Sequence, residues 1–167
     1  VNIRKEAKGL NLIYAGRIHP IKNIHYMISV LNHIDACINV DLTIVGPIED
    51  QKYFAKCLSL TKKLPNNISV NFINELSGEE LSYYYSKSHF FYSLTLGENF
   101  GHSIFESFVH SRPVIISNKT PWRELNSKNI GWDLSLETIE SISQTINLAA
   151  ELEEEDWIEM CKKSRLF

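Results

Sequence analysis

The sequence predicts an α/β fold: a Rossmann-like, doubly wound parallel sheet of about six strands with helices on both faces. The main observation is that short apolar runs alternate with segments of helical periodicity, which is typical of parallel strands joined by crossover helices. The length of 167 residues suits one domain, residues 1–167, with a core that needs no disulfides. Its 44% apolar and 22% charged residues are those of a globular domain.

Six apolar runs are expected to form the strands. They cover residues 10–15, 40–45, 68–72, 89–94, 113–117 and 130–134. In such a sheet, ligands bind outside the carboxyl ends of the strands, at the point where the strand order reverses. We therefore expect functional residues in the loops after the first five strands: 16–22, 46–49, 73–76, 95–101 and 117–124.

The segments between the strands predict helices. Asn23 is expected to cap the first helix, whose apolar stripe follows the i, i+3, i+4, i+7 pattern: Ile24, Met27, Ile28, Leu31 and Ile34. Further helices are expected at residues 50–63, 77–87, 101–109, 136–146 and 153–167. Ser77 and Glu80 have the spacing of a capping box, and in the fourth helix Ile104, Phe105 and Phe108 are expected to face inward.

Composition excludes several classes of function. With 20 acidic and 17 basic side chains and a net charge of −3, the chain lacks the basic footprint of a nucleic-acid binder. Its three cysteines form no C-x-x-C motif, so neither zinc nor a disulfide framework is indicated, and a cytoplasmic setting is the default. No apolar run approaches the ~20 residues of a membrane span. The missing initiator Met indicates a piece of a longer chain.

The first loop combines two cations with a strand end. Arg17 and Lys22 lie between Gly16 and the expected helix start at Asn23. Cationic side chains beside free helix N–H groups make an anion site, suited to a phosphate or diphosphate. Neither G-x-G-x-x-G nor the P-loop pattern is present, so no dinucleotide or Walker-type site is indicated.

The fourth loop contributes two carboxylates, Glu98 before the expected helix and Glu106 two turns inside it. Eight helical residues rise about 12 Å, whereas the carboxyls of a retaining glycosidase lie roughly 5–5.5 Å apart. The pair therefore suits hydroxyls at opposite ends of one extended ligand, and Gly101 lets that ligand approach the backbone. A nucleotide-sugar fits, with its diphosphate at Arg17 and Lys22, its ribose at Glu106 and its sugar at Glu98.

Two motifs carry a family resemblance. Gly16, Arg17, Lys22 and Asn23 match G-R-x-x-x-x-K-[GN], and Glu98, Phe100, Gly101 and Glu106 match E-x-F-G-x-x-x-x-E. Over about residues 10–150 the chain resembles the C-terminal, donor-binding domain of the group 1 glycosyltransferases (family 4, GT-B fold). The resemblance implies an enzyme of the retaining hexosyltransferase type that uses a nucleotide-diphosphate-sugar as donor.

The resemblance also implies residue roles. Arg17, Lys22 and Glu98 would be catalytic, the two cations neutralising the leaving diphosphate. The donor would be bound by Gly16, Asn99, Phe100, Gly101, His102, Ser103 and Glu106. Its base is expected near Pro47, Ile73 and Asn74. No D-x-D motif occurs, so no metal and no cofactor are expected. Where many members have a Gly-rich turn, this chain has residues 119–123. Two roles are open for Pro121 and Trp122 there, shaping the donor cleft or packing the turn, and packing is favoured.

The family context implies partners outside this chain. The N-terminal acceptor domain is absent, so the fragment alone is expected not to transfer sugar. The acceptor would be a glycan or lipid-linked glycan in surface polysaccharide or lipopolysaccharide synthesis, with at most peripheral contact with the inner face of the membrane. Alternatives left open are a non-catalytic nucleotide or sugar-phosphate binding module and a GT-B epimerase or phosphorylase. A receiver domain is disfavoured, because the first strand ends in Gly16-Arg17 rather than in an acidic cluster.

Overall fold

A computed structural model describes residues 3–167 and confirms the α/β sheet. Its six strands are β1 (Gly9–Ala15), β2 (Asn39–Val45), β3 (Ile68–Ile73), β4 (Phe90–Ser93), β5 (Val114–Ser117) and β6 (Gly131–Leu134). All neighbouring strands pair in parallel, in the order β3-β2-β1-β4-β5-β6. The six predicted strands are therefore all present.

Six α-helices connect or follow the strands. They are α1 (Ile24–Leu31), α2 (Gln51–Thr61), α3 (Gly78–Ser86), α4 (His102–Val109), α5 (Ile139–Glu151) and α6 (Glu154–Leu166). The predicted capping box at α3 is confirmed, since the Ser77 hydroxyl accepts from the Glu80 N–H and the Glu80 carboxylate accepts from the Ser77 N–H. No helix within the described residues is long and apolar enough to span a bilayer.

Alternating side chains of β1 pack on opposite faces of the sheet. Leu12 and Tyr14 belong to a larger core with side chains from α1, α2, α5 and α6. Ile13, between them in sequence, belongs to a smaller core that includes Tyr85 of α3 and Phe108 of α4. Both faces are therefore covered, as the apolar strand sequences require.

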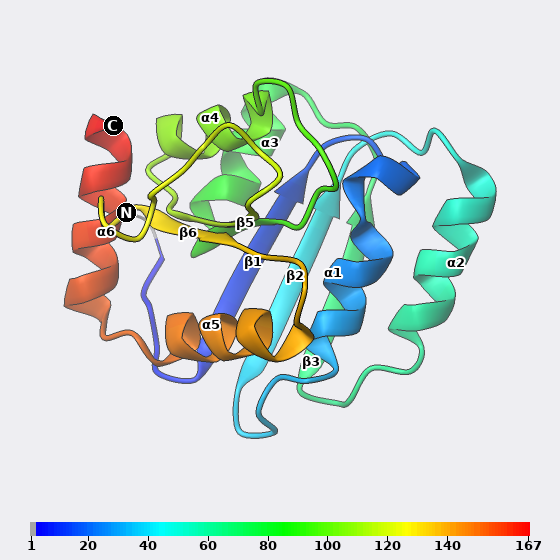
Figure 1. The fold of residues 1–167 in the computed structure, drawn as a ribbon, viewed down its shortest axis with the longest axis horizontal. Helices are drawn as coiled ribbons and strands as arrows, with labels where there is room; N and C mark the ends of the chain where they lie inside the picture. Colours follow the sequence, from blue (N-terminus) through cyan, green and yellow to red (C-terminus); the bar gives the residue numbers. More distant parts are fainter. Residues whose placement is uncertain (1–2) are drawn as a thin grey trace.

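The strand order reverses between β1 and β4, which are neighbours in the sheet although β2 and β3 lie between them in sequence. From β1 the chain runs outward through β2 to β3. It then returns to the other side of β1, where β4, β5 and β6 follow in order. The loops that follow β1 and β4 consequently meet at the switch point. In Figure 1 the arrowheads of β1 and β2 point toward the edge where these loops lie.

Three details of the predicted helices differ in the structure. Asn23 is at the N-cap position of α1, as predicted, but its side chain does not bond to the helix, because its backbone is left-handed (φ 58°) and its side-chain amide donates to the Leu94 carbonyl at 2.9 Å. The same helix ends at Leu31, although Ile34 beyond it is still buried. Phe105 of α4 is 50% exposed rather than inward-facing. It points away from the sheet because it lies about 100° around the helix from buried Ile104.

His89, at the start of β4, is a buried neutral imidazole. Its Nδ1 accepts from the Asn11 N–H at 2.8 Å, and its Nε2 lies 2.9 Å from the Arg4 carbonyl, to which it donates. Burial is the main cause that lowers the pKa of His89 to about 4. A proton on Nδ1 would break the bond from Asn11, so the fold requires the neutral form.

We expect the free energy of unfolding to fall as the pH decreases from 6.5 toward 4. The unfolded chain binds a proton at its ordinary pKa of about 6.5 and the folded chain does not, so acid favours unfolding by about 2 kcal/mol between pH 7.5 and pH 5. Urea titrations across this range, compared with His89→Gln, measure the effect. The two proteins share the other histidines, so only His89 distinguishes their pH dependence. If their free energies of unfolding changed with pH in parallel, the prediction would be contradicted.

Candidate functional site

The floor of the site is formed where β1, β2 and β3 end side by side. The Gly16 N–H donates to the Val45 carbonyl at 2.9 Å, and the Gly46 N–H donates to the Ile73 carbonyl at 3.1 Å. Gly46 has a φ of +149°, and a Cβ placed on it would lie 1.9 Å from the Gly16 carbonyl oxygen. Only glycine fits at this crossing, so the backbone itself lines the floor.

Arg17 follows this floor and extends toward solvent. Its backbone carbonyl accepts from the Tyr14 hydroxyl at 3.0 Å, and the next N–H, that of Ile18, donates to Pro47 at 2.8 Å. Burial raises the pKa of Tyr14 far above its usual value, so the hydroxyl remains a donor. The guanidinium lies 2.9 Å from a carboxylate oxygen of Glu49.

Lys22 ends a single 3-10 turn, Pro20–Lys22, that precedes α1. Its Nζ lies 2.6 Å from Glu98 Oε2, which brings together two residues 76 positions apart. The exposed fractions of these side chains are 14% and 21%, against 53% and 39% for Arg17 and Glu49. The Lys22–Glu98 pair is therefore screened less by solvent than the Arg17–Glu49 pair.

The β4–α4 loop, residues 94–101, is anchored to its neighbours on both sides. The Leu96 N–H donates to the Ile21 carbonyl at 2.9 Å, which joins the loop to the Lys22 turn. On the other side, the Ser117 hydroxyl donates to Thr95 at 2.6 Å and the Glu98 N–H donates to Lys119 at 3.2 Å. The position of Glu98 is thus set by backbone contacts with two other loops.

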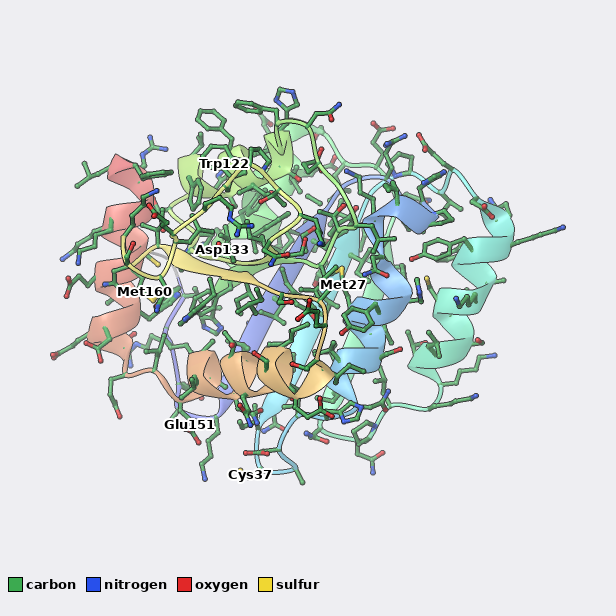
Figure 2. The ribbon with its side chains drawn as sticks, in the orientation of Figure 1. Met27, Cys37, Trp122, Asp133, Glu151 and Met160 are labelled. Carbon is green, nitrogen blue, oxygen red and sulfur yellow. The ribbon has the colours of Figure 1, made fainter. Side chains whose placement is uncertain are left out.

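Trp122 supports the far end of this loop. Its indole N–H donates to the Phe100 carbonyl at 2.6 Å, and its ring packs on Phe100 and Phe108. Figure 2 shows it beside α4. Gly101 has a φ of +82°, and a Cβ there would lie 2.9 Å from the indole nitrogen. Trp122 therefore packs its turn, as predicted, and also contacts the loop that contains Glu98.

Three connected hollows run along this edge of the sheet. The Lys22 hollow, of about 350 Å³, is lined by Arg17, Ile21, Lys22, Gly97, Glu98 and Asn99. The Glu106 hollow, of about 360 Å³, includes Gly16, Arg17, Gly46, Pro47, Glu75, His102, Ser103 and Glu106. The Asn74 hollow, of about 120 Å³, is lined by Ile18, Gly46, Ile48, Phe54, Phe72, Ile73 and Asn74. Arg17 lines the first two and Gly46 the last two, so the hollows adjoin one another, and we refer to the three together as the cleft.

The structure brings most of the predicted site residues to this cleft. Arg17, Lys22, Glu98 and Asn99 line the Lys22 hollow, while Gly16, His102, Ser103 and Glu106 line the Glu106 hollow. Phe100 and Gly101 are outside both linings. The first turn of α4 begins at this cleft. The N–H groups of Ile104 and Phe105 donate to the Gly101 carbonyl. The first-turn N–H groups that remain for a ligand are therefore those of His102 and Ser103.

Two acidic residues of the site were not predicted from the sequence. Glu49 contacts Arg17, and Glu75 lines the Glu106 hollow. Both lie in loops that are expected to be functional, 46–49 and 73–76. The sequence signal that could have found them is an acidic residue in a loop that neighbours the loop of Arg17 and Lys22. Within residues 3–167, no group of three or more His, Cys, Asp or Glu side chains is arranged to hold a metal ion.

Comparison with known proteins gives the family. A sequence model described as "Glycosyl transferases group 1" matches residues 2–164. The chain belongs to this family of glycosyltransferases. The resemblance carried by the two motifs is thereby confirmed, and the match covers nearly the whole chain. No curated protein has a significantly similar sequence.

Solved glycosyltransferases share the fold at low sequence identity. WaaG, involved in lipopolysaccharide biosynthesis, superposes with a TM-score of 0.78 at 16% identity over 97% of this chain and 43% of WaaG. HepE from Anabaena, in complex with UDP and glucose, gives 0.74 at 16% identity over 95% of this chain and 43% of HepE. The catalytic domain of the cholesterol-α-glucosyltransferase from Helicobacter pylori gives 0.72 at 14% identity, over 94% of this chain and 95% of that domain. This glycosyltransferase chain thus spans less than half the length of WaaG and HepE.

Proposed function

We propose that the chain is the donor-binding domain of a retaining hexosyltransferase whose acceptor-binding domain lies elsewhere in a longer protein. The carrying observation is the row of adjoining hollows, in which Arg17 lies between the Lys22–Glu98 pair and Glu106. This order matches that of sugar, diphosphate and ribose along a nucleotide-sugar. The Asn74 hollow beyond Gly46 would take the base.

The two cations would bind the diphosphate together with the free N–H groups of α4. As the bond from the sugar C1 to the phosphate oxygen breaks, the leaving nucleoside diphosphate takes both electrons, while the acceptor hydroxyl forms the new bond to C1 and gives up its proton to the diphosphate. Arg17 and Lys22 would stabilise that developing charge, which requires no metal. Glu98 would then accept from sugar hydroxyls in the Lys22 hollow.

The relatives suggest a narrower donor and setting. Because HepE is a complex with UDP and glucose, a uridine-diphosphate-linked hexose is the first donor to test. WaaG acts in lipopolysaccharide biosynthesis, and we extend a role in surface-glycan synthesis at the cytoplasmic side of the membrane to this chain. Isothermal titration with UDP, GDP, ADP and CDP tests the proposal. It predicts binding of at least one, and no heat with any of them at millimolar concentration would contradict it.

Glu106→Ala is expected to abolish discrimination between ribose and deoxyribose. In the proposed mode a ribose hydroxyl donates to this carboxylate, and a hydrogen bond to a charged group makes a difference of about 10- to 100-fold in affinity. Titration of the preferred diphosphate and its 2′-deoxy analogue measures it, with Glu140→Ala, at an exposed position of α5, as the control. Undiminished preference for the ribonucleotide in Glu106→Ala would place the ribose elsewhere.

A further inference from the structure

Arg17, the central cation of the cleft, is already occupied by a carboxylate of its own chain. Its guanidinium lies 2.9 Å from Glu49 Oε2. A diphosphate would compete for the same N–H donors, because a carboxylate and a phosphate bind the guanidinium through the same geometry. Binding at Arg17 therefore involves the exchange of one anion for another.

The main chain at Arg17 is held without the Glu49 side chain. The Arg17 backbone is fixed by the Tyr14 hydroxyl and by the Ile18 N–H bond to Pro47, neither of which involves the Glu49 side chain. Conversely, Glu49 is held near Arg17, since its N–H donates to the Ile18 carbonyl at 3.3 Å beside the parallel bridge between Ile18 and Ile48. A displaced Glu49 side chain would thus remain within reach of Arg17.

The charges at the cleft also oppose an anionic ligand. The cations Arg17 and Lys22 line it together with the carboxylates Glu75, Glu98 and Glu106, and Glu49 adds a fourth carboxylate at Arg17. Acidic groups thus outnumber Arg and Lys among these residues. Of the four, Glu98 and Glu106 have proposed hydroxyl partners, and Glu75 belongs to no ion pair of the described residues. Glu98 contacts Lys22 and Glu49 contacts Arg17, so Glu49 is the carboxylate that pairs with a phosphate-binding cation and has no proposed hydroxyl partner.

We propose that Glu49 is a displaceable counter-ion of Arg17 that weakens binding of nucleoside diphosphates at this cleft. The inference rests on the proposed function. A phosphate group replaces the carboxylate when the ligand binds, and Glu49 returns to Arg17 when the product diphosphate leaves. Glu49 therefore limits the affinity for the leaving nucleotide.

Isothermal titration of Glu49→Gln with UDP and with uridine tests the proposal. An exposed ion pair is weak, so we expect UDP to bind about two- to fivefold more tightly than to the wild type. Uridine lacks phosphates, and its affinity is expected to stay unchanged. In an Arg17→Ala background, Glu49→Gln is expected to have no effect on UDP, because the contact is already lost.

Glu75→Gln is the matched control, because it removes the same charge from the same cleft without contacting Arg17. An equal gain in UDP affinity for Glu49→Gln and Glu75→Gln would mean that only the general field matters, and would overturn the proposal. Unchanged or weaker UDP binding by Glu49→Gln would also overturn it. In both cases the proposed function still stands if the wild-type protein binds UDP and Arg17→Ala weakens that binding. Absence of binding by the wild type to all four diphosphates would overturn both.

Discussion

Replacing Lys22 by alanine is expected to weaken binding of the preferred nucleoside diphosphate by about 10- to 100-fold, the range for one hydrogen bond to a charged group. Lys22 is the less exposed of the two cations at the cleft. A charge there acts in a lower effective dielectric than at Arg17, so its electrostatic contribution is larger. Loss of Lys22 also leaves the Glu98 carboxylate without its 2.6 Å partner and closer to the phosphates.

This second effect separates the two contributions of Lys22. In Lys22→Ala/Glu98→Gln the unpaired carboxylate is gone, so part of the lost affinity for the diphosphate is expected to return. Titration calorimetry of the single and double variants measures both values, and Lys52→Ala, at an exposed position of α2, controls for net charge. A Lys22→Ala protein that is folded by circular dichroism and binds the diphosphate like the wild type would exclude the proposed diphosphate position.

The sequence predicts the fold and the convergence of the site for one reason. Strand and helix periodicities are local, and parallel pairing then places every strand's carboxyl end at the same edge. Lys22 and Glu98 are 76 residues apart, yet each follows a strand at the switch point. To predict that they lie close together therefore requires knowledge of the strand order but none of side-chain packing.

The features that the sequence did not predict depend on the conformations of the loops and on how side chains pack. The contact between Glu49 and Arg17 joins two loops whose relative path is set by the backbone bonds of Ile18, and no periodicity encodes it. Phe105 is as apolar as Ile104 and Phe108 but packs at the surface against Phe100. Asparagine is a preferred residue at helix N-caps, but the left-handed backbone of Asn23 turns its side chain toward Leu94.

Gly46→Ala is expected to lower the free energy of unfolding by about 3 kcal/mol or more, as overpacking and an incompatible backbone conformation act together. The added Cβ would lie 1.9 Å from the Gly16 carbonyl oxygen and 2.7 Å from its carbon. Both are backbone atoms at the end of β1, where Gly16 also donates to Val45, so no side-chain rotation relieves the clash. The ends of β1 and β2 must separate, and Gly46 is shared by the Glu106 and Asn74 hollows. Diphosphate binding is therefore expected to be lost with stability.

Gly78→Ala provides the matched control, because a Cβ there meets no atom within 4 Å and Gly78 begins α3. The same substitution is expected to stabilise the protein by about 0.4–1 kcal/mol, since alanine restricts the unfolded chain. Urea denaturation of both variants gives the two free energies. Gly46→Ala within 1 kcal/mol of the wild type would mean that β1 and β2 can separate easily. A cleft with such a movable floor would not hold Arg17 and Glu106 at a fixed spacing, and a rigid diphosphate site between them would have to be abandoned.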